Sequence, residues 1–465
     1  MLDPDTVRND PRRVKEAIRA KGTGSPALVD TLLEVDEERR AAITELQETQ
    51  SRQNDLSQQI GALKREGKDA EAEAIIEKTS QMKEDIKRLK EEVQEAETEQ
   101  EELVLEFPNI PHPSVPVGED EDDNDVAETF GERPSFDFDP APHWELADRH
   151  GLVDLERGAK VTGSGFPFYL GKGARLQRAL LNFFLDRARE RGYTEMQAPL
   201  FVNPESAEGT GQLPDKEGLM YEIKEPNLKN VEDWVTNRLM HRGEIPDDED
   251  EVRRDIRPMI NDLMEGDFYP IPTAEVPVTN FHRDEILSAD DLPLQYCTYS
   301  PCWRREAGSY GADVRGLNRL HQFDKVELVR IVHPDESYRA LDELLADAES
   351  ALDALELPYR RLLMCTGDMG FTQAKVYDLE VWSAAQERWL EVSSVSNFEA
   401  FQARRMQIRY RPEPEAKPEL VHTLNGSGLA FPRIVAALLE NNQQPDGSIE
   451  LPEALHPYTG FARIE

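Results

Sequence analysis

The sequence predicts an α+β protein in which an antiparallel helical hairpin precedes a domain built on a mostly antiparallel sheet flanked by helices. Three observations indicate this class. Apolar residues recur at steps of three and four over residues 28–105, a proline-punctuated acidic segment follows, and short strand-like runs then alternate with helical ones. We therefore expect a helical arm over residues 1–106, a linker over residues 107–135 and an α+β domain over residues 136–465.

The hairpin is predicted by two apolar stripes of similar length, separated by the sequence REGKDAE, in which Gly67 supplies a turn. At the rise of an α-helix, each arm would be about 50 Å long. The residues alone leave two interpretations open, a dimerisation coiled coil and a rigid probe for a long and distant partner. Eight of the 16 Lys lie in residues 1–90. The stripes consist of Leu32, Val35, Ala42, Leu46, Leu56, Ile60 and Leu63, and of Ile75, Met82, Ile86, Leu89, Val93, Ala96 and Leu103.

The formal net charge of −39 is unusual for a protein of this size. Taken alone it argues against nucleic acid, because RNA binding requires Lys and Arg to neutralise phosphates. The acidic residues are spread along the whole sequence, however, and only 16 of the 54 basic residues are Lys. This pattern is typical of a salt-saturated cytoplasm, where the Debye length falls to about 3 Å at 1 M salt. We therefore expect a halophilic source, and the charge does not identify the partner.

Several classes of protein are excluded by what the sequence lacks. No apolar run is long enough to span a membrane, and the first 30 residues do not resemble a signal peptide. The three cysteines, Cys297, Cys302 and Cys365, cannot form a disulfide framework, and no pair of them has the spacing of a zinc site. We expect reduced, buried cysteines, a cytoplasmic location and no zinc.

The segment from Cys297 to Glu327 carries the densest chemistry. It contains an Arg-Arg-Glu cluster, a loop with Gly, Asp and Arg, and the sequence HQFDKVE. Cations, an aromatic ring and carboxylates are what a site needs to hold a nucleoside triphosphate together with a small amino-bearing substrate. A GxxxxGK[ST] phosphate loop is absent from the sequence, so side chains would have to hold the nucleotide.

These motifs resemble those of class II aminoacyl-tRNA synthetases, specifically seryl-tRNA synthetases of a haloarchaeal-like, bacterial type rather than the zinc-dependent methanogen type. The Cys297–Glu327 segment resembles motif 2, RLQRALLNFFLDRARERGYTEMQAPLF resembles motif 1, and GLAFPRIVAALLE resembles motif 3. The resemblance covers nearly the whole chain, and further includes the hairpin, NIPHPSVP, PTAEVP, YDLEVW, EVSSVSN and FQARR.

The resemblance implies an ATP site in which two arginines are catalytic. Arg304 would hold the α-phosphate and the attacking carboxylate, and Arg433 would cover one face of adenine and reach the γ-phosphate. Glu306 would accept a hydrogen bond from the adenine amino group, and Phe323 would stack on the ring. Glu391 and Ser394 would bind Mg²⁺. The implied ATP-binding set is Arg304, Arg305, Glu306, Phe323, Glu391, Val392, Ser393, Ser394 and Arg433.

The same resemblance implies a serine–tRNA ligase. The enzyme would form seryl-adenylate from serine and ATP and transfer the seryl group to the 3′ end of serine tRNA, with selenocysteine tRNA as a further substrate if the organism has one. The hairpin would lie along the long variable arm of serine tRNA, and motif 1 would form the interface of a homodimer. The serine pocket would consist of Thr273, Ala274, Glu275, Glu327 and Ser427.

Three features depart from the family pattern. A long acidic insert occupies about residues 223–266, with helical spacing at Val231–Met240 and Val252–Met264. Trp303 stands where Phe commonly precedes the motif 2 arginine, and Val395 stands where Cys is frequent.

Three rival functions stay open on the sequence. The first is a ligase for threonine, proline or glycine. The second is a synthetase-like protein that charges a carrier protein or only binds RNA. The third is a structural coiled-coil protein, which would leave the motif residues without a role.

Overall fold

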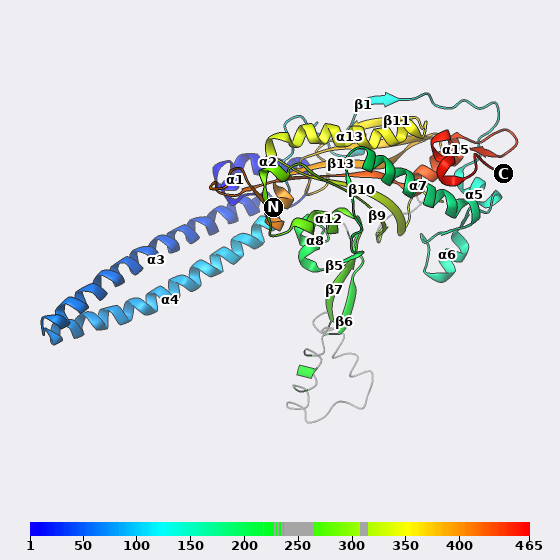
Figure 1. The fold of residues 1–465 in the computed structure, drawn as a ribbon. Coiled ribbons are helices and arrows are strands. Elements are labelled where there is room, and N and C mark those ends of the chain that lie inside the picture. Colours follow the sequence, from blue (N-terminus) through cyan, green and yellow to red (C-terminus); the bar gives the residue numbers. More distant parts are fainter. Residues whose placement is uncertain (217, 227–228, 230–231, 234–235, 237–263, 307–314) are drawn as a thin grey trace. The chain divides into compact units, whose positions relative to one another are not determined.

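The computed structural model describes residues 1–216, 218–226, 229, 232–233, 236, 264–306 and 315–465 (Figure 1). The chain divides into two compact units. The first, which we call the arm unit, comprises Met1–Pro111 and Val117–Glu119. The second, the sheet unit, comprises His112–Pro116 and Asp120–Glu465. Among the described residues, no helix is both long enough and apolar enough to cross a membrane.

The arm unit is a helical hairpin, which confirms the prediction. Short helices α1 (Pro4–Asn9) and α2 (Pro11–Lys21) precede two long helices, α3 (Ala27–Arg65) and α4 (Asp69–Leu105), which run antiparallel (Figure 1). Gly67 forms the turn between α3 and α4 at a φ of 72°, in the left-handed region that glycine tolerates best.

The seam between α3 and α4 is not wholly apolar. Leu89 is buried in it, but so is Gln100, whose amide donates to Asp36 at 3.1 Å. Arg8 and Arg39 also donate to this carboxylate. Burial raises the pKa of Asp36, but the hydrogen bonds from Arg39, Arg8 and Gln100 outweigh it and hold the pKa below its ordinary value. Polar residues that interrupt the apolar stripes, such as Gln100, therefore find their hydrogen-bond partners within the arm unit.

Within the described residues, the sheet unit is built on an eight-stranded sheet in the order β1-β11-β12-β13-β16-β10-β9-β4. Neighbouring strands pair antiparallel except β4 with β9, as expected for the predicted α+β class. The strands are β1 (Asp125–Phe130), β11 (Tyr359–Leu363), β12 (Lys375–Ser383), β13 (Arg388–Glu399), β16 (His422–Ala430), β10 (Gln322–Val332), β9 (Leu294–Trp303) and β4 (Thr194–Glu195).

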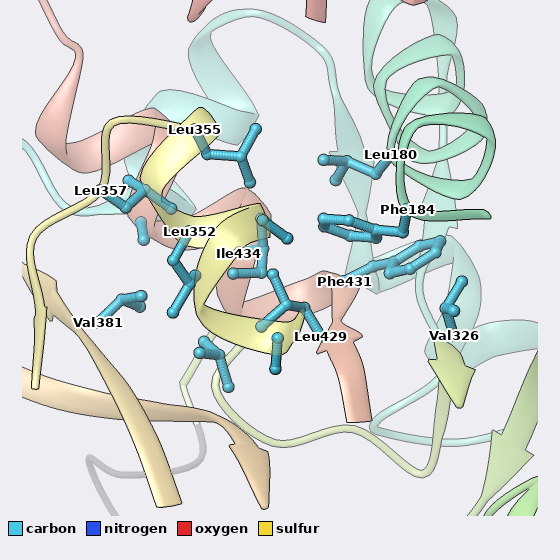
Figure 2. Close-up of a cluster of buried hydrophobic side chains, with 14 of the residues drawn as sticks. Leu180, Phe184, Val326, Leu352, Leu355, Leu357, Val381, Leu429, Phe431 and Ile434 are labelled. Atoms are coloured by element: carbon cyan, nitrogen blue, oxygen red, sulfur yellow. The ribbon is translucent and has the colours of Figure 1, made fainter. Parts of the chain in front are cut away.

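Three helices cover one face of this sheet: α7 (Gly171–Glu190), α13 (Ser337–Ala354) and α15 (Phe431–Asn441). Figure 2 shows side chains of all three packed against Val326 and Val381 of the sheet. Because side chains alternate along a strand, the same strands present their other side chains to the opposite face. That opposite face carries the candidate site.

Smaller elements complete the sheet unit. The short helices are α5 (His143–Arg149), α6 (Leu155–Val161), α8 (Pro204–Thr210), α12 (Glu275–Thr279), α14 (Phe401–Met406) and α16 (His456–Thr459). In the part of the chain that the structure describes, two strand pairs are formed by β2 (Val153–Asp154) with β3 (Phe168–Tyr169), and by β17 (Ile449–Glu450) with β18 (Arg463–Ile464). One three-stranded sheet has the order β15 (Glu419–Leu420), β14 (Arg409–Arg411), β8 (Ile286–Ser288), and another has the order β5 (Phe201–Val202), β7 (Met264–Pro270), β6 (Ile223–Pro226).

The structure describes parts of the expected linker and of the expected insert. Strand β1, which lies inside the expected linker over residues 107–135, pairs with β11 at the edge of the large sheet. At the ends of the expected insert, β6 and β7 pair antiparallel, and Met264 begins β7. The two expected helical segments of the insert fall largely outside the described residues. The domain boundaries themselves stay a prediction.

Candidate active site

The face of the large sheet opposite α7, α13 and α15 carries a cavity of about 420 Å³. Strands β10, β13 and β16 contribute to it, together with the segment before α12 and the first turn of α15. Ten residues that the sequence assigned to a site line this one cavity: Thr273, Glu275, Arg304, Glu306, Phe323, Glu391, Val392, Ser394, Ser427 and Arg433.

Strand alternation and register bring these distant motifs together. On β10, Lys325 lines the cavity, whereas Val326 and Leu328 pack into the core on the other face. Glu327 lies two residues beyond Lys325 and therefore shares its face. In the ladder between β10 and β16, Glu327 pairs with Ser427, so HQFDKVE and NGSG become neighbours across two strands.

Arg304 lines the cavity beside Phe323. Its Nε donates to the carbonyl of Pro272 at 3.3 Å, and its guanidinium carbon lies 5.3 Å from the ring centroid of Phe323. Glu306 lies nearby with a φ of 49°, and its carboxylate accepts a hydrogen bond from Nε of Arg319. A cation, an aromatic face and a carboxylate thus line the same cavity, a combination suited to an adenine nucleotide.

Arg433 reaches the cavity from α15. Its Nε donates to the carbonyl of Asn318 at 2.9 Å, and one terminal nitrogen donates to the carbonyl of Glu391 at 2.6 Å. Two backbone carbonyls therefore orient this guanidinium. An oriented planar guanidinium is suited to bridging phosphate oxygens.

Glu391 and Ser394, the expected Mg²⁺ ligands, lie with a second acidic residue, Asp378. Asp378 of β12 pairs in register with Ser394 of β13, and its Oδ1 is buried with no hydrogen-bond partner among the described residues. Burial and the charge of Glu391 raise the pKa of Asp378 well above its ordinary value, against a lowering hydrogen bond with Ser394. An unsatisfied carboxylate oxygen beside a second carboxylate fits a site that a cation completes.

Magnesium suits these residues better than a metal held by protein alone. In the described parts of the chain, no group of three or more His, Cys, Asp and Glu side chains is arranged to hold a metal ion. Mg²⁺ commonly takes only one or two carboxylates from the protein and completes its shell with waters and substrate phosphates.

A buried polar cluster adjoins the cavity, in which Thr273 and Lys325 line the wall and Glu327 is bonded to both. Glu327 is fully buried, and its Oε2 accepts hydrogen bonds from the hydroxyl of Thr273 at 2.5 Å and from Nζ of Lys325. Lys325 also donates to the Thr273 hydroxyl at 2.8 Å. The other oxygen of Glu327, Oε1, finds no partner within the described structure. A buried acceptor without a donor is what a pocket for an ammonium or hydroxyl group would present.

Glu275 supplies a second carboxylate beside this cluster. Gln402 donates to its Oε1 at 2.6 Å, and Asn425 donates to its Oε2 at 2.7 Å. Burial raises the pKa of Glu275 to about 7, with the neighbouring charge of Glu327 adding to the rise and the hydrogen bond from Gln402 opposing it. A bound cationic ligand would lower the pKa of Glu275 again.

Some predicted residues lie elsewhere. Arg305 lines a separate groove with Tyr221 and Tyr269 rather than the main cavity. Ala274 is buried in a hydrophobic cluster, and Ser393 is buried with its hydroxyl donating to a backbone carbonyl of β16. These three side chains do not line the cavity. The fully buried Glu327 does not line it either, but it is hydrogen-bonded to Thr273, which does.

Several residues of the cavity were not predicted from the sequence. Lys325, Asn425 and Asp378 line it, and Gln402 holds one of its carboxylates. Three of the four lie on strands. Lys325 is two residues from Glu327 and Asn425 is two residues from Ser427, whereas Asp378 lies directly across the β12–β13 ladder from Ser394. A search of each strand at period two would have found Lys325 beside Glu327 and Asn425 beside Ser427. Gln402 lies in FQARR, a motif to which the sequence alone assigns no role.

Comparison with known proteins agrees with this geometry. Residues 1–111 match the seryl-tRNA synthetase N-terminal domain, and residues 259–442 match the tRNA synthetase class II core domain (G, H, P, S and T). A serine–tRNA ligase of Salinibacter ruber is 82% identical over 464 residues, covering 100% of this chain and 99% of that protein. One of Geobacillus kaustophilus is 50% identical over 461 residues, with 99% of both covered.

A solved structure extends the match to the fold. The crystal structure of seryl-tRNA synthetase from Pyrococcus horikoshii complexed with ATP superimposes with a TM-score of 0.87 at 33% identity, covering 100% of this chain and 99% of that one. With relatives this similar over its full length, the chain belongs to the seryl-tRNA synthetase family of class II aminoacyl-tRNA synthetases.

Proposed function

We propose that this chain is an ATP-dependent serine–tRNA ligase that forms seryl-adenylate and transfers the seryl group to the 3′ end of serine tRNA. The observation that carries the proposal is the convergence of Arg304, Arg433, Phe323, Thr273 and Glu275 on one cavity, with the buried Glu327 hydrogen-bonded to Thr273 beside it. Full-length similarity to serine–tRNA ligases supports it.

In the first step, the serine carboxylate attacks the α-phosphorus of ATP in line and pyrophosphate leaves. Arg304 lines the cavity and holds the charge that develops on the α-phosphate, and Arg433 holds the γ-phosphate. Mg²⁺, held by Glu391 and Ser394, would neutralise charge on the phosphate oxygens. In this scheme no protein nucleophile takes part, so the chain accelerates the step by positioning and electrostatic stabilisation.

Serine is recognised at the buried polar cluster. The unpartnered Oε1 of Glu327 accepts from the substrate, and Glu275 attracts its α-ammonium group. Alanine, which has no hydroxyl, would leave buried polar groups of this cluster unpaired. The composition of the pocket therefore favours the smallest hydroxyl-bearing amino acid.

In the second step, a ribose hydroxyl of the tRNA attacks the carbonyl carbon of the adenylate and AMP leaves. We propose, from the family resemblance, that α3 and α4 bind the long variable arm of serine tRNA and that the enzyme is a cytoplasmic homodimer. A halophilic source, a role for selenocysteine tRNA and the absence of zinc stay predictions of the sequence.

The rival functions differ in specific observations. A ligase for threonine, proline or glycine would share the class II core but has no need of the seryl-type N-terminal domain that residues 1–111 match. A coiled-coil protein without enzymatic activity would have no use for the clustered arginines and buried carboxylates of the cavity.

The test is serine-dependent exchange of pyrophosphate into ATP, measured in molar KCl with serine, threonine and alanine in parallel. We expect serine to support exchange far better than the other two. Arg304→Ala and Glu327→Ala should each lower the rate by about 100-fold or more. Arg339→Ala, which removes an exposed arginine of α13, serves as the matched control and should retain activity. Serine-dependent exchange that survives Arg304→Ala would overturn the assignment of roles.

A further inference from the structure

A buried ionic cluster adjoins the cavity and has no part in the mechanism above. His143, the first residue of α5, and Glu440, near the end of α15, are both fully buried. Nδ1 of His143 lies 2.7 Å from Oε1 of Glu440, and the backbone N–H of His143 donates to the same oxygen at 2.9 Å. The other carboxylate oxygen accepts from the hydroxyl of Ser383 and from the backbone N–H of Ala385 at 3.2 Å.

The hydrogen bonds define the protonation of the pair. The backbone N–H of Leu317 donates to Nε2 of His143 at 2.9 Å, so Nε2 is an acceptor and Nδ1 carries the proton. Burial raises the pKa of Glu440, but hydrogen bonds from His143 and Ser383 outweigh it and hold the pKa below its ordinary value. The imidazole therefore bridges the carboxylate of Glu440 to the main chain at Leu317.

Through this bridge, His143 and Glu440 hold residues 315–317 of the motif 2 region, which lie shortly before β10. Gly316 packs against the imidazole so closely that a Cβ there would lie 2.3 Å from Nε2 of His143, and its φ is +70°. Next to it, the guanidinium of Arg315 lies 4.5 Å from the ring centroid of Trp144. Helix α5 thus fixes three consecutive residues, 315–317, by a ring contact, a close approach and a hydrogen bond.

The next residue carries the connection to the cavity. The side chain of Asn318 donates to Gln386 at 2.8 Å, and Gln386 in turn donates to Glu440 at 3.2 Å. The carbonyl of Asn318 is the acceptor for Nε of Arg433 at 2.9 Å. Arg433 and Glu440 are seven residues apart on α15, about two helical turns, and so lie on the same side of the helix. One helix therefore carries both the arginine and the carboxylate that holds the arginine's acceptor in place.

We propose that His143 and Glu440 are positioning residues for ATP: together they lock the 315–318 segment to α15, so that the Asn318 carbonyl aims the Arg433 guanidinium at the phosphates. The proposal rests on the role of Arg433 in the proposed function. It assigns neither residue a contact with the substrate.

Three substitutions separate the two ends of the bridge. His143→Asn keeps a donor toward Glu440 and loses the acceptor for Leu317, whereas His143→Gln keeps an acceptor and loses the donor. Glu440→Gln keeps the shape of the carboxylate and removes its charge. The matched control is Glu349→Gln. Glu349 is also buried and also accepts ionic hydrogen bonds, from Arg361 at 2.8 Å, but it lies on α13 and does not line the cavity.

The experiment measures KM for ATP and KM for serine by pyrophosphate exchange, and equilibrium binding of ATP without serine, well below the melting temperature of each variant. We expect His143→Asn and Glu440→Gln to weaken ATP binding and raise KM for ATP by about tenfold, with KM for serine changed less than about twofold. Glu349→Gln should lower the melting temperature without this ATP-specific change. If the two KM values rise together, or neither changes in folded variants, the pair is structural only and the proposal is wrong.

A double-mutant cycle tests whether the effect passes through Arg433. In an Arg433→Ala background, Glu440→Gln should weaken ATP binding by less than about twofold, because the group that it positions is already gone. An undiminished tenfold effect in that background would overturn the proposal. The binding measurement also separates the two failures: wild-type protein that binds ATP without serine-dependent exchange refutes the proposed function alone, and wild-type protein that does not bind ATP refutes both.

Discussion

Glu275 shows how burial can prepare a carboxylate for a cationic substrate. It is held by Gln402 and Asn425 and lies near the ionic group of Lys325 and Glu327. Its pKa is raised to about 7, first by burial and then by the charge of Glu327. Without substrate, a fraction of the protein molecules therefore has a neutral Glu275 carboxyl at neutral pH. A bound α-ammonium group would lower the pKa of Glu275 and so release the proton.

We predict that serine binding weakens as the pH falls through about 7. Glu275 takes up a proton in this range, and a neutral carboxyl no longer attracts the ammonium group. KM for serine should rise by up to about tenfold per pH unit below 7, whereas KM for ATP should not follow this profile. Calorimetric titration with serine in buffers of different ionisation enthalpy should detect proton release near pH 7.

The control for this prediction is Glu275→Gln, which should weaken serine binding and abolish the proton release. Ionisation of Glu275 favours serine binding, but it has the opposite effect on the stability of the folded protein. Since the folded pKa lies above the ordinary value of 4.5, ionisation disfavours the folded state, and this destabilisation develops as the pH rises from 4.5 through 7. Glu275→Gln should therefore raise the melting temperature at pH 8. A serine affinity that is constant between pH 6 and 8 would contradict the role of Glu275.

Neighbouring arginines should differ sharply in importance. Arg304 lines the cavity, whereas Arg305 lines the groove with Tyr221 and Tyr269. We predict that Arg304→Ala lowers serine-dependent exchange by about 100-fold or more and Arg305→Ala by less than tenfold. Equal losses in the two variants, measured side by side at saturating ATP, would show that the groove belongs to the nucleotide site after all.

At the scale of elements, strand geometry decides which motif residues reach the cavity. In the run from Glu391 to Ser394 a register shift in the β12–β13 ladder interrupts the alternation, so Glu391 and Ser394 both line the cavity while the Ser393 hydroxyl bonds to β16. The sequence could identify the motifs because each is a recognisable string. It could not identify Asp378, because its role arises from the register of β12 on β13, and a register between two strands is not written in either strand alone.

The β12–β13 ladder leads to a prediction about magnesium. Glu391 and Ser394 lie on β13, and Asp378 faces Ser394 from β12. We predict that Glu391→Gln raises the Mg²⁺ concentration needed for half-maximal exchange by about tenfold or more, because it removes one of the few charged ligands. Glu380→Gln is a matched control on the same ladder, since Glu380 is bonded to Arg360 and does not line the cavity. An unchanged Mg²⁺ requirement in Glu391→Gln would place the ion elsewhere.

The helical hairpin was the element most fully predictable from sequence. Its two long helices are α3 at Ala27–Arg65 and α4 at Asp69–Leu105, and the expected hairpin covered residues 28–105. Local periodicity suffices there, because the contacts repeat along two adjacent segments. The sequence did not foresee that Asp36 and Gln100 would bond to each other inside the seam, since that contact joins residues 64 positions apart.

At the scale of the whole molecule, the division into two compact units suggests a division of labour. The cavity lies entirely in the sheet unit, and residues 1–111 match a domain of their own. Adenylate formation should therefore depend on the sheet unit, and tRNA selection should depend on both. The negative charge of −39 does not conflict with an RNA partner if the protein works in concentrated salt.

We predict that replacing residues 28–105 by a short flexible linker leaves serine-dependent exchange within about threefold of wild type, because activation needs no contact from the hairpin. Aminoacylation of serine tRNA should fall by about 100-fold or more, as a second binding module is lost. Parallel assays on one preparation would check both. Loss of exchange in a folded variant, or full aminoacylation, would contradict the division.

The central claim is that one cavity holds the nucleotide and selects serine. A crystal structure with a non-hydrolysable seryl-adenylate analogue tests it most directly. We predict the seryl ammonium or hydroxyl within about 3 Å of Oε1 of Glu327, and the phosphate mimic within hydrogen-bond distance of Arg304. An analogue bound away from this cavity, or one that touches neither Glu327 nor Arg304, would contradict the account.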